Sequence, residues 1–434
     1  MTDFSMLGLK PRILTTLEEL GINAPTPIQA RAIPEVMNGH DVMGLAQTGT
    51  GKTLAFGLPL LHQAIAAGEK PQPRKVRALV LAPTRELVNQ IADNLYPFTK
   101  GTHLKVTKVV GGASINAQVK RLERGADILV ATPGRLIDLI ERRAVSLDET
   151  TFLVLDEADQ MLDMGFIHAL RQLVPMLADE RQTMLFSATM NKQMSEIAGA
   201  YLTNPVRIEV SPPGKAADKV TQEVHFVPQA GKTDKLVEHI AGHRQEMSLV
   251  FCRTKHGADR LTKNLVAAGI DAAAIHGNKS QGQRERALKA FRDGKINVLV
   301  ATDVAARGID IPGVQFVYNY ELPNVPENYV HRIGRTARAG REGQAVALCA
   351  ASEYGELKAI EKVMGIKITV ASGRPPEGAE IADAPRKGGG RRRFNGAKSG
   401  GHGKPNGQRK PQGQSQGKPG GGKQRRPRRA KTAA

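Results

Sequence analysis

Two acidic residues, Asp156 and Glu157, directly follow an apolar run at residues 151–155. A short run of this kind predicts a buried β-strand. Because open α/β sheets bind their ligands at the carboxyl ends of strands, we expect both carboxylates in a binding site. Asp156 is predicted to ligate Mg²⁺, partly through water, and Glu157 to orient an attacking water as its base. Adjacent acids also occur at solvated helix starts, but the preceding apolar strand argues against that interpretation.

A glycine-rich segment upstream supplies the other half of this chemistry. Residues 46–53 match the phosphate-loop pattern G-x-x-x-x-G-K-[ST], except that Ala46 replaces the first glycine. In such loops the backbone N–H groups and the lysine hold phosphates, and the last residue ligates Mg²⁺. The helix expected after the loop points its positive end at the same anion. The pattern predicts an ATP and Mg²⁺ site formed by Gln47, Thr48, Gly49, Thr50, Gly51, Lys52 and Thr53, with Lys52 and Asp156 also acting in catalysis.

A similar triplet, Gly231-Lys232-Thr233, occurs in the second half of the chain. Phe226 stands where the phosphate-loop pattern requires its first glycine. We therefore expect a solvated helix start at this triplet, and phosphate binding by the first half alone.

Three arginines fall within seven residues, Arg332, Arg335 and Arg338. They could form a solvated helix face. We favour the alternative that Arg335 and Arg338 reach a γ-phosphate as arginine fingers with a catalytic role. Fingers from a second domain would arrive only when the domains close, which would couple hydrolysis to closure.

Short β-branched runs alternate with helical stretches, which predicts parallel sheets of the α/β class. The segment Ser211-Pro212-Pro213-Gly214 predicts a linker between a first domain at about 1–210 and a second at about 218–370. The predicted strands are 41–46, 77–82, 128–131, 152–155, 183–186 and 207–210, then 223–227, 248–252, 272–275, 297–301, 316–320 and 344–349. Polar clusters follow these strands, so each domain is expected to have one chemical edge, with the active site in a cleft between the two edges.

In this order the segments resemble the DEAD-box RNA helicases, over roughly residues 4–345. Phe4, Gly21 and residues 25–29 resemble the Q motif of that family, which implies that Gln29 reads the adenine edge and Phe4 stacks on the base. The resemblance also implies two tandem RecA-like domains, which ATP and single-stranded RNA close together. The closed form bends one RNA strand, so a short duplex separates locally.

The resemblance further implies which residues contact RNA and which couple the two activities. RNA-backbone contacts are implied for Pro83, Thr84, Arg85, Gly111, Gly112, Thr132, Pro133, Gly134, Arg135, Arg253 and Thr302. Gly308 and Asp310 are implied at the nucleotide, with Asp310 at the ribose, and Gln281 with Arg284 among the RNA- and ATP-contacting motifs. Coupling is implied for Asp159, Ser187, Thr189 and His331. Such contacts predict binding that is independent of sequence and prefers RNA to DNA.

One position departs from the family pattern. Ala337 stands where the family usually has glycine. The methyl group would matter only if the backbone there needed a positive φ. We expect a helix at this position, where alanine is tolerated.

The net charge of +20 is concentrated at the C-terminal end. Residues 386–434 contain 16 Lys and Arg and no acid, whereas residues 1–385 contain 46 basic and 42 acidic residues. After residue 372 the Gly-, Pro-, Arg- and Gln-rich composition predicts a disordered tail. A polycation of this kind predicts RNA binding, although it could bind an acidic protein or only solubilise the chain. A core followed by a basic tail resembles the bacterial RhlE-type subgroup.

The remaining composition predicts a cytoplasmic protein with no membrane segment or secretory signal. Cys252 and Cys349 lie in apolar runs and are expected to be buried free thiols. No residue spacing predicts a zinc, haem or redox site. Ribosomal precursor particles and RNA-decay proteins are candidate partners.

Two other functions remain open. An RNA annealer or clamp would depend mainly on the basic tail, with ATP controlling release. A DNA translocase could use the same two-domain scaffold, but Gln29 and the tetrapeptide at 156–159 argue against it.

Overall fold

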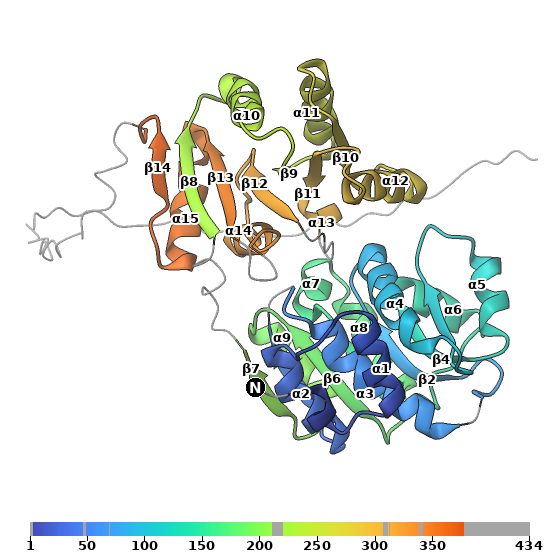
Figure 1. Ribbon diagram of the computed structural model, residues 1–434. Helices are drawn as coiled ribbons and strands as arrows, with labels where there is room; N and C mark the ends of the chain where they lie inside the picture. The colour runs from blue at the N-terminus through green and yellow to red at the C-terminus, as the bar shows by residue number, and fades with distance from the viewer. Residues whose placement is uncertain are drawn as a thin grey trace, which may run out of the picture. The chain divides into compact units, whose positions relative to one another are not determined.

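The structure is a computed structural model that describes residues 3–46, 49–68, 70–210, 220–306, 311, 313–337 and 342–376. Gln47, Thr48, Gly308, Asp310 and Arg338 therefore lie outside the described residues, as do the predicted linker and the basic tail. The described residues contain two seven-stranded sheets with flanking helices (Figure 1). We refer to residues 3–210 as the first domain and to residues 220–376 as the second domain.

The first domain contains a parallel sheet. Its strands are β1 (Val42–Leu45), β2 (Val76–Leu81), β3 (Val106–Val109), β4 (Ala126–Ala131), β5 (Phe152–Leu155), β6 (Gln182–Ser187) and β7 (Val206–Glu209). Their order in the sheet is β3-β4-β2-β5-β6-β1-β7. The helices are α1 (Pro11–Glu19), α2 (Pro27–Met37), α3 (Lys52–Ala67), α4 (Arg85–Thr99), α5 (Ile115–Leu122), α6 (Pro133–Glu141), α7 (Ala158–Asp163), α8 (Ile167–Leu173) and α9 (Lys192–Tyr201), preceded by the 3-10 helix η1 (Phe4–Leu7).

The central strands of this sheet are buried on both faces. Every residue of β4 and β5 is buried, as expected for parallel strands covered by helices on both sides. Side chains alternate between two apolar clusters, so Val154 belongs to one cluster and its neighbours Leu153 and Leu155 to the other. The two clusters hold the ends of the central strands, where the predicted site lies.

The second domain repeats this architecture. Its strands are β8 (Val220–Phe226), β9 (Met247–Cys252), β10 (Ala272–Ile275), β11 (Val298–Thr302), β12 (Val314–Asn319), β13 (Gly343–Cys349) and β14 (Thr369–Ser372). They form a parallel sheet in the order β10-β11-β9-β12-β13-β8-β14. The helices are α10 (Lys232–Ala241), α11 (Lys255–Ala267), α12 (Gln281–Arg292), α13 (Asp303–Ala306), α14 (Pro326–Ile333) and α15 (Tyr354–Met364), with the 3-10 helix η5 (Ala351–Glu353).

The two parallel sheets confirm the predicted α/β class. All twelve predicted strands are present, most of them displaced by a residue or two at an end. Two strands were not predicted, β3 and β14, and both are edge strands. β14 is exposed at three of its four positions, so it lacks the apolar run that marks a central strand. β14 also continues two residues past the end predicted for the second domain.

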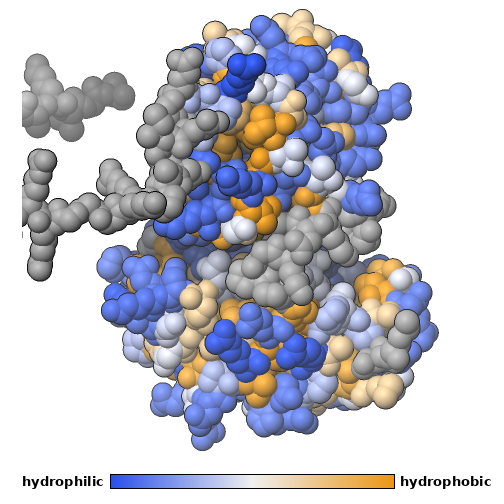
Figure 2. Space-filling model, turned by 90° about the vertical axis from the view of Figure 1, so that its left-hand side faces the viewer, coloured by the Kyte–Doolittle hydropathy of each residue, from blue (hydrophilic) through white to orange (hydrophobic). Residues whose placement is uncertain are grey.

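One face of the molecule is mainly polar where described residues form it. Hydrophilic side chains cover most of the visible face, with hydrophobic ones in small separate patches (Figure 2). Among the described residues, no helix combines the length and apolarity needed to cross a bilayer. Cys252 and Cys349 are buried free thiols, as predicted.

Candidate nucleotide and nucleic-acid site

The phosphate loop lies between β1 and α3. Gly49 and Gly51 have φ angles of 86° and 91°, which glycine adopts without strain. A Cβ at Gly51 would come within 2.6 Å of the Gln29 amide nitrogen, so a side chain has no room there. Ala46 continues the pairing of β1 by donating its N–H to the Ser187 carbonyl at 3.0 Å. Its methyl group is therefore compatible with the loop, although the pattern has glycine at this position.

Gln29 connects the start of α2 to the phosphate loop. Its Oε1 accepts from the Thr26 N–H at 2.9 Å, and its Nε2 donates to the Gly51 carbonyl at 3.0 Å. These bonds use one donor and one acceptor of an amide that has two of each, which leaves one of each for a base edge. Phe4 is 3% exposed and packs in the core of the first domain. The adenine contacts of both residues stay predictions.

Three charged residues meet near the carboxyl end of β5. Lys52, Asp156 and Glu157 are at most 6% exposed. The Lys52 Nζ lies 3.9 Å from the Asp156 Oδ1, which also accepts from the Glu157 N–H at 3.0 Å. Burial raises the pKa of Asp156 to about 6, although the charge of Lys52 opposes this shift. A cavity of about 390 Å³ is lined by these three residues and by Thr53, so a phosphate group and a cation can reach them.

Glu157 has a strained backbone. Its φ of 53° and ψ of 50° fall in the left-handed region, which costs a residue other than glycine about 1–2 kcal/mol. Glu157 is the N-cap of α7, so this conformation turns the chain from β5 into the helix. Strain of this kind persists where surrounding structure fixes it, and it concentrates at functional sites.

Asp159 joins the acids to residues 187–189, which begin at the last residue of β6. Its Oδ2 accepts from the Ala188 N–H at 3.0 Å, the Thr189 N–H at 2.9 Å and the Thr189 hydroxyl at 3.2 Å. Its Oδ1 accepts from the Gln160 N–H at 2.9 Å. The Ser187 hydroxyl donates to the Thr189 carbonyl at 2.6 Å. Three of the predicted coupling residues thus form one hydrogen-bonded unit.

The RNA-contact residues predicted in the first domain gather at the carboxyl ends of the neighbouring strands β3, β4 and β2. The Arg85 guanidinium lies against the two glycines after β3, because a Cβ at Gly112 would be 2.0 Å from its Nη1. Burial lowers the pKa of Arg85, and the nearby charge of Arg135 acts in the same direction. The Arg135 Nη1 donates to the Ala113 carbonyl at 3.1 Å. Thr84 caps α4 and Thr132 precedes α6, which begins with Pro133 and Gly134.

In the second domain the first of the three arginines is structural. Arg332 is buried and bidentate to Asp303, with distances of 2.5 and 2.8 Å. Its Nη1 also donates to the Asn319 Oδ1 at 3.0 Å and to the Glu321 carbonyl at 2.7 Å. A buried arginine needs such partners, because its charge cannot be neutralised by losing a proton. This network fixes the start of the segment that carries the predicted fingers.

Arg335 follows α14 and is also buried. Its Nε donates to the His331 carbonyl at 3.3 Å. His331 and Arg335 line a small pocket together with Phe251 and Asp303. The structure therefore brings the predicted finger and the predicted coupling histidine together, at the carboxyl edge of the second sheet.

Arg253 directly follows β9, and Thr302 is the last residue of β11. The Arg253 Nε donates to the Leu322 carbonyl at 2.5 Å, and its Nη2 lies 3.1 Å from Glu353. The side chain is 27% exposed, so part of it can contact RNA while the rest is held within the domain. Glu353 was not predicted as a partner of Arg253, although its position four residues after the end of β13 resembles that of the other polar residues at strand ends.

The prediction of a solvated helix start at Gly231-Lys232-Thr233 is wrong for Lys232. The helix start at residues 231–233 is not solvated, because the Lys232 side chain is 0% exposed. Its ammonium donates to the Tyr320 carbonyl at 2.9 Å and pairs with Glu353. A buried ammonium is tolerated only with such partners. The triplet gave no sign of this partner, which lies more than a hundred residues further on.

The prediction of a helix at Ala337 is also wrong. It lies in a loop rather than a helix, since α14 ends at Ile333 and Ala337 has a φ of 54°. The Thr336 hydroxyl bonds to the Val314 and Gln315 carbonyls at 2.7 and 2.9 Å, which turns the chain against the start of β12. The glycine usual in the family would adopt this φ without strain, whereas alanine does not.

These features define a class of protein. A glycine-rich loop leads from a parallel strand into a helix, and an acid pair ends another strand of the same sheet. A second parallel sheet of equal size follows in the chain. This is the architecture of a tandem RecA-like nucleoside-triphosphatase.

Comparison with known proteins gives the family. Residues 26–197 match the DEAD/DEAH box helicase domain, and residues 231–340 match the helicase conserved C-terminal domain. The chain is 43% identical over 362 residues to the ATP-dependent RNA helicase CshA of Listeria monocytogenes, covering 83% of this chain and 69% of that protein. The chain belongs to the DEAD-box ATP-dependent RNA helicases, and it is an ATP hydrolase of that class.

Solved structures agree with this assignment and with two RecA-like domains. S. cerevisiae Dbp5 bound to RNA and ADP BeF3 matches with a TM-score of 0.77 and 32% identity, covering 86% of this chain and 96% of that chain. Mss116 bound to single-stranded RNA and UDP-BeF matches with a TM-score of 0.78 and 28% identity, covering 89% of this chain and 82% of that chain.

Proposed function

We propose that this helicase couples the hydrolysis of ATP with Mg²⁺ to the local separation of short RNA duplexes, or to the remodelling of RNA–protein complexes. The observation that supports this best is the set of bonds at Asp159. Asp159 lies in the first turn of α7, two residues after Glu157, and these bonds connect it to Ala188 and Thr189 after β6. A change at the phosphate end of the site can therefore reach this neighbouring loop through a single turn of helix.

The nucleotide is held mainly by the first domain in this proposal. Lys52 and the N–H groups of residues 47–53 bind the β- and γ-phosphates, and Glu157 accepts a proton from the attacking water. The oxygens of Asp156 and Thr53 are the donors that Mg²⁺ prefers, and the ion would neutralise the charge on the phosphates. The remaining nucleotide contacts are Gln29 and Phe4 at the base, Asp310 at the ribose together with Gly308 nearby on the nucleotide, and Arg335 and Arg338 at the γ-phosphate.

RNA binds along its backbone in this proposal. Arg85 and Arg135 supply charge at one edge of the first sheet, where the missing side chains of Gly111 and Gly112 leave room for the Arg85 guanidinium. The backbone of the two glycines contacts the RNA strand beside it. Contacts to phosphates and 2′-hydroxyls carry no sequence information, so binding is sequence-independent and favours RNA. His331 and Asp159 transmit the state of the nucleotide to this surface.

The setting is also part of the proposal. The protein acts in the cytoplasm, on ribosomal precursor particles or with RNA-decay proteins, and belongs to the RhlE-type subgroup. The basic segment at 386–434 keeps RNA near the core and so raises its local concentration.

Steady-state ATP hydrolysis tests the enzymatic part. Single-stranded RNA should stimulate hydrolysis, and DNA of the same length should not. Glu157→Gln should reduce the stimulated rate by at least about 100-fold, because it removes a general base. The exposed Glu180→Gln is the matched control. A rate that ignores RNA, or that survives in Glu157→Gln, would overturn the proposal.

Removal of residues 386–434 distinguishes a helicase from an RNA annealer or clamp. The positive charge of this segment is the observation that favours the annealer or clamp. A helicase lacking the segment binds RNA more weakly but still separates duplexes at saturating RNA. An annealer lacking it loses its activity.

A further inference from the structure

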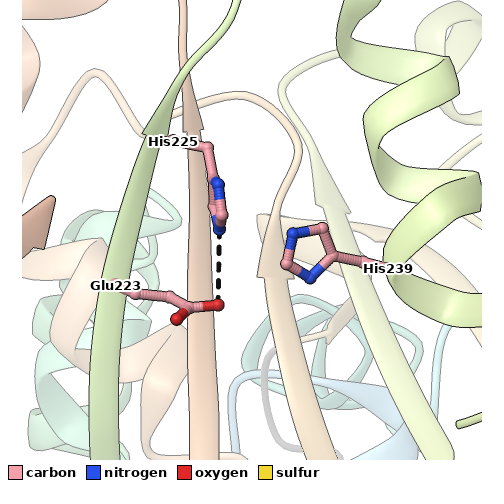
Figure 3. Close-up of side chains that lie close together, drawn as sticks. All are labelled: Glu223, His225 and His239. Carbon is pink, nitrogen blue, oxygen red and sulfur yellow. Dashed lines mark hydrogen bonds and ion pairs between the residues drawn. The ribbon is translucent and has the colours of Figure 1, made fainter. Parts of the chain in front are cut away.

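Two imidazoles and a carboxylate gather in the second domain on β8 and α10, two elements that carry none of the residues proposed to contact ATP or RNA. Glu223 and His225 are two apart on β8, so their side chains lie on the same face of the sheet. His239 comes from α10, which lies over that face (Figure 3). One ligand atom from each residue lies within 4.8 Å of the other two.

His225 is already oriented as metal-binding histidines are. Its Nδ1 lies 2.7 Å from the hydroxyl of Ser372, its partner in the register of β14 and β8. Its Nε2 points at Glu223, 3.4 Å from Oε1. Histidine ligands commonly use one ring nitrogen for such an outer hydrogen bond and the other for the metal.

This geometry leaves a choice between two tautomers. If Nδ1–H donates to Ser372, then Nε2 presents a lone pair to the Glu223 carboxylate, and two acceptors face each other. A cation between them removes this repulsion. If instead Nε2–H points to Glu223, a hydrogen bond accounts for the pair without any metal.

His239 completes the cluster. Its ring meets the His225 ring edge-on, with centroids 4.5 Å apart.

We propose that Glu223, His225 and His239 form a binding site for a divalent transition-metal ion, with Zn²⁺ as the ion that fits best. Two imidazole nitrogens and one carboxylate oxygen are a donor set that Zn²⁺ takes in three-ligand sites, with water in the fourth position. Mg²⁺ and Ca²⁺ prefer oxygen donors and are disfavoured.

The site needs only a small contraction. Zinc bonds of about 2.0–2.1 Å in a tetrahedron place ligand atoms roughly 3.3 Å apart. Rotation of the partly exposed Glu223 and His239 side chains can close the present separation while β8 stays in place. The ion would connect β8 to α10 and, through Ser372, to β14. Its role is to stabilise this side of the second domain, and it takes no part in hydrolysis.

The test uses the full-length chain, freed of metal with a chelator and free of nucleotide. Titration with ZnCl₂ should show one ion per chain, with a Kd of the order of 1 µM or below. Zn²⁺ should raise the Tm, because it binds only the folded domain. Co²⁺ in its place should give the visible absorption of a tetrahedral site.

Matched variants locate the site. His239→Gln and Glu223→Gln should each weaken Zn²⁺ binding at least about tenfold and abolish the rise in Tm. His256→Gln removes an exposed histidine of the same domain and should change neither. The two substitutions lie on different elements, so the test still holds if one of the variants fails to fold. Absence of saturable Zn²⁺ binding, or equal binding by His239→Gln and Glu223→Gln, would overturn the proposal and leave a hydrogen-bonded cluster.

Discussion

At the scale of residues, Glu157 and Ala337 hold left-handed backbone conformations, with φ angles of 53° and 54°. Each stands beside a group to which we assign chemistry. Glycine would relieve the backbone strain at Glu157 but would also remove the carboxylate proposed as the base. The strain is therefore retained with this function. Ala337 contributes only a methyl group, so its strain can be relieved.

We expect Ala337→Gly to stabilise the second domain by about 0.5–1 kcal/mol, because glycine adopts this φ freely but loses more chain entropy on folding. Thermal unfolding of the full chain should show a Tm higher by roughly 2 °C. Ala267→Gly, at the exposed end of α11, is the control and should lower the Tm. A lower Tm for Ala337→Gly would show that the backbone is not strained there.

Asp156 gives a prediction about pH. Its pKa is raised by burial from 3.8 in the unfolded chain to about 6. The folded chain therefore holds this proton more tightly, so the stability contributed by the group is complete below 3.8 and is lost as the pH rises through about 6. Without nucleotide, Asp156→Asn should be more stable than the parent at pH 7.5, by of the order of 2 kcal/mol.

The measurement is the Tm difference between the two proteins from pH 5 to pH 8. We expect the advantage of Asp156→Asn to shrink as the pH falls through about 6, because the parent carboxyl then becomes neutral as well. A difference that does not vary with pH would contradict the role given to burial.

At the scale of elements, the contact between the start of α4 and the turn after β3 can be broken at one atom. Gly112 has a φ of 71°, and a Cβ there would meet the Arg85 guanidinium at 2.0 Å. Gly112→Ala should displace Arg85 and reduce RNA affinity by roughly tenfold, the loss of a charged phosphate contact. ATP affinity without RNA should not change.

Gly165→Ala is the matched control. Gly165 has a φ of 79°, and a Cβ there would meet nothing within 4 Å. The two variants share the backbone strain and differ in the contact with Arg85. If both weaken RNA binding equally, the strain is responsible and Arg85 is not.

Much of this arrangement could be predicted from the sequence, because apolar runs mark buried strands and polar clusters mark their ends. The edge strands β3 and β14 could not be predicted, because strands with exposed or partly exposed positions lack a continuous apolar run. The ion pair of Lys232 with Glu353 joins residues far apart in the chain, and local pattern contains no information about it. The left-handed turn at Ala337 depends on bonds from Thr336 to β12, which propensity alone does not predict.

At the scale of the whole molecule, the chain divides its tasks. Residues 1–385 are nearly balanced in charge, whereas residues 386–434 carry 16 basic residues and no acid. We propose that the two domains carry out hydrolysis and strand separation, and that the basic tail adds a salt-dependent attraction to RNA. In this proposal Asp159 couples hydrolysis to strand separation.

The most direct test measures RNA-stimulated ATP hydrolysis and duplex separation side by side in the double variant Ser187→Ala, Thr189→Val. This variant removes the Ser187 hydroxyl bond of 2.6 Å and the Thr189 hydroxyl bond to Asp159 of 3.2 Å, and it leaves Lys52, Asp156 and Glu157 untouched. The exposed Thr203→Val is the control. We predict hydrolysis within about twofold of the parent and duplex separation reduced at least roughly tenfold, the loss of about one hydrogen bond to a charged group. Duplex separation equal to that of the parent, or a parallel fall in both activities, would contradict coupling through Asp159.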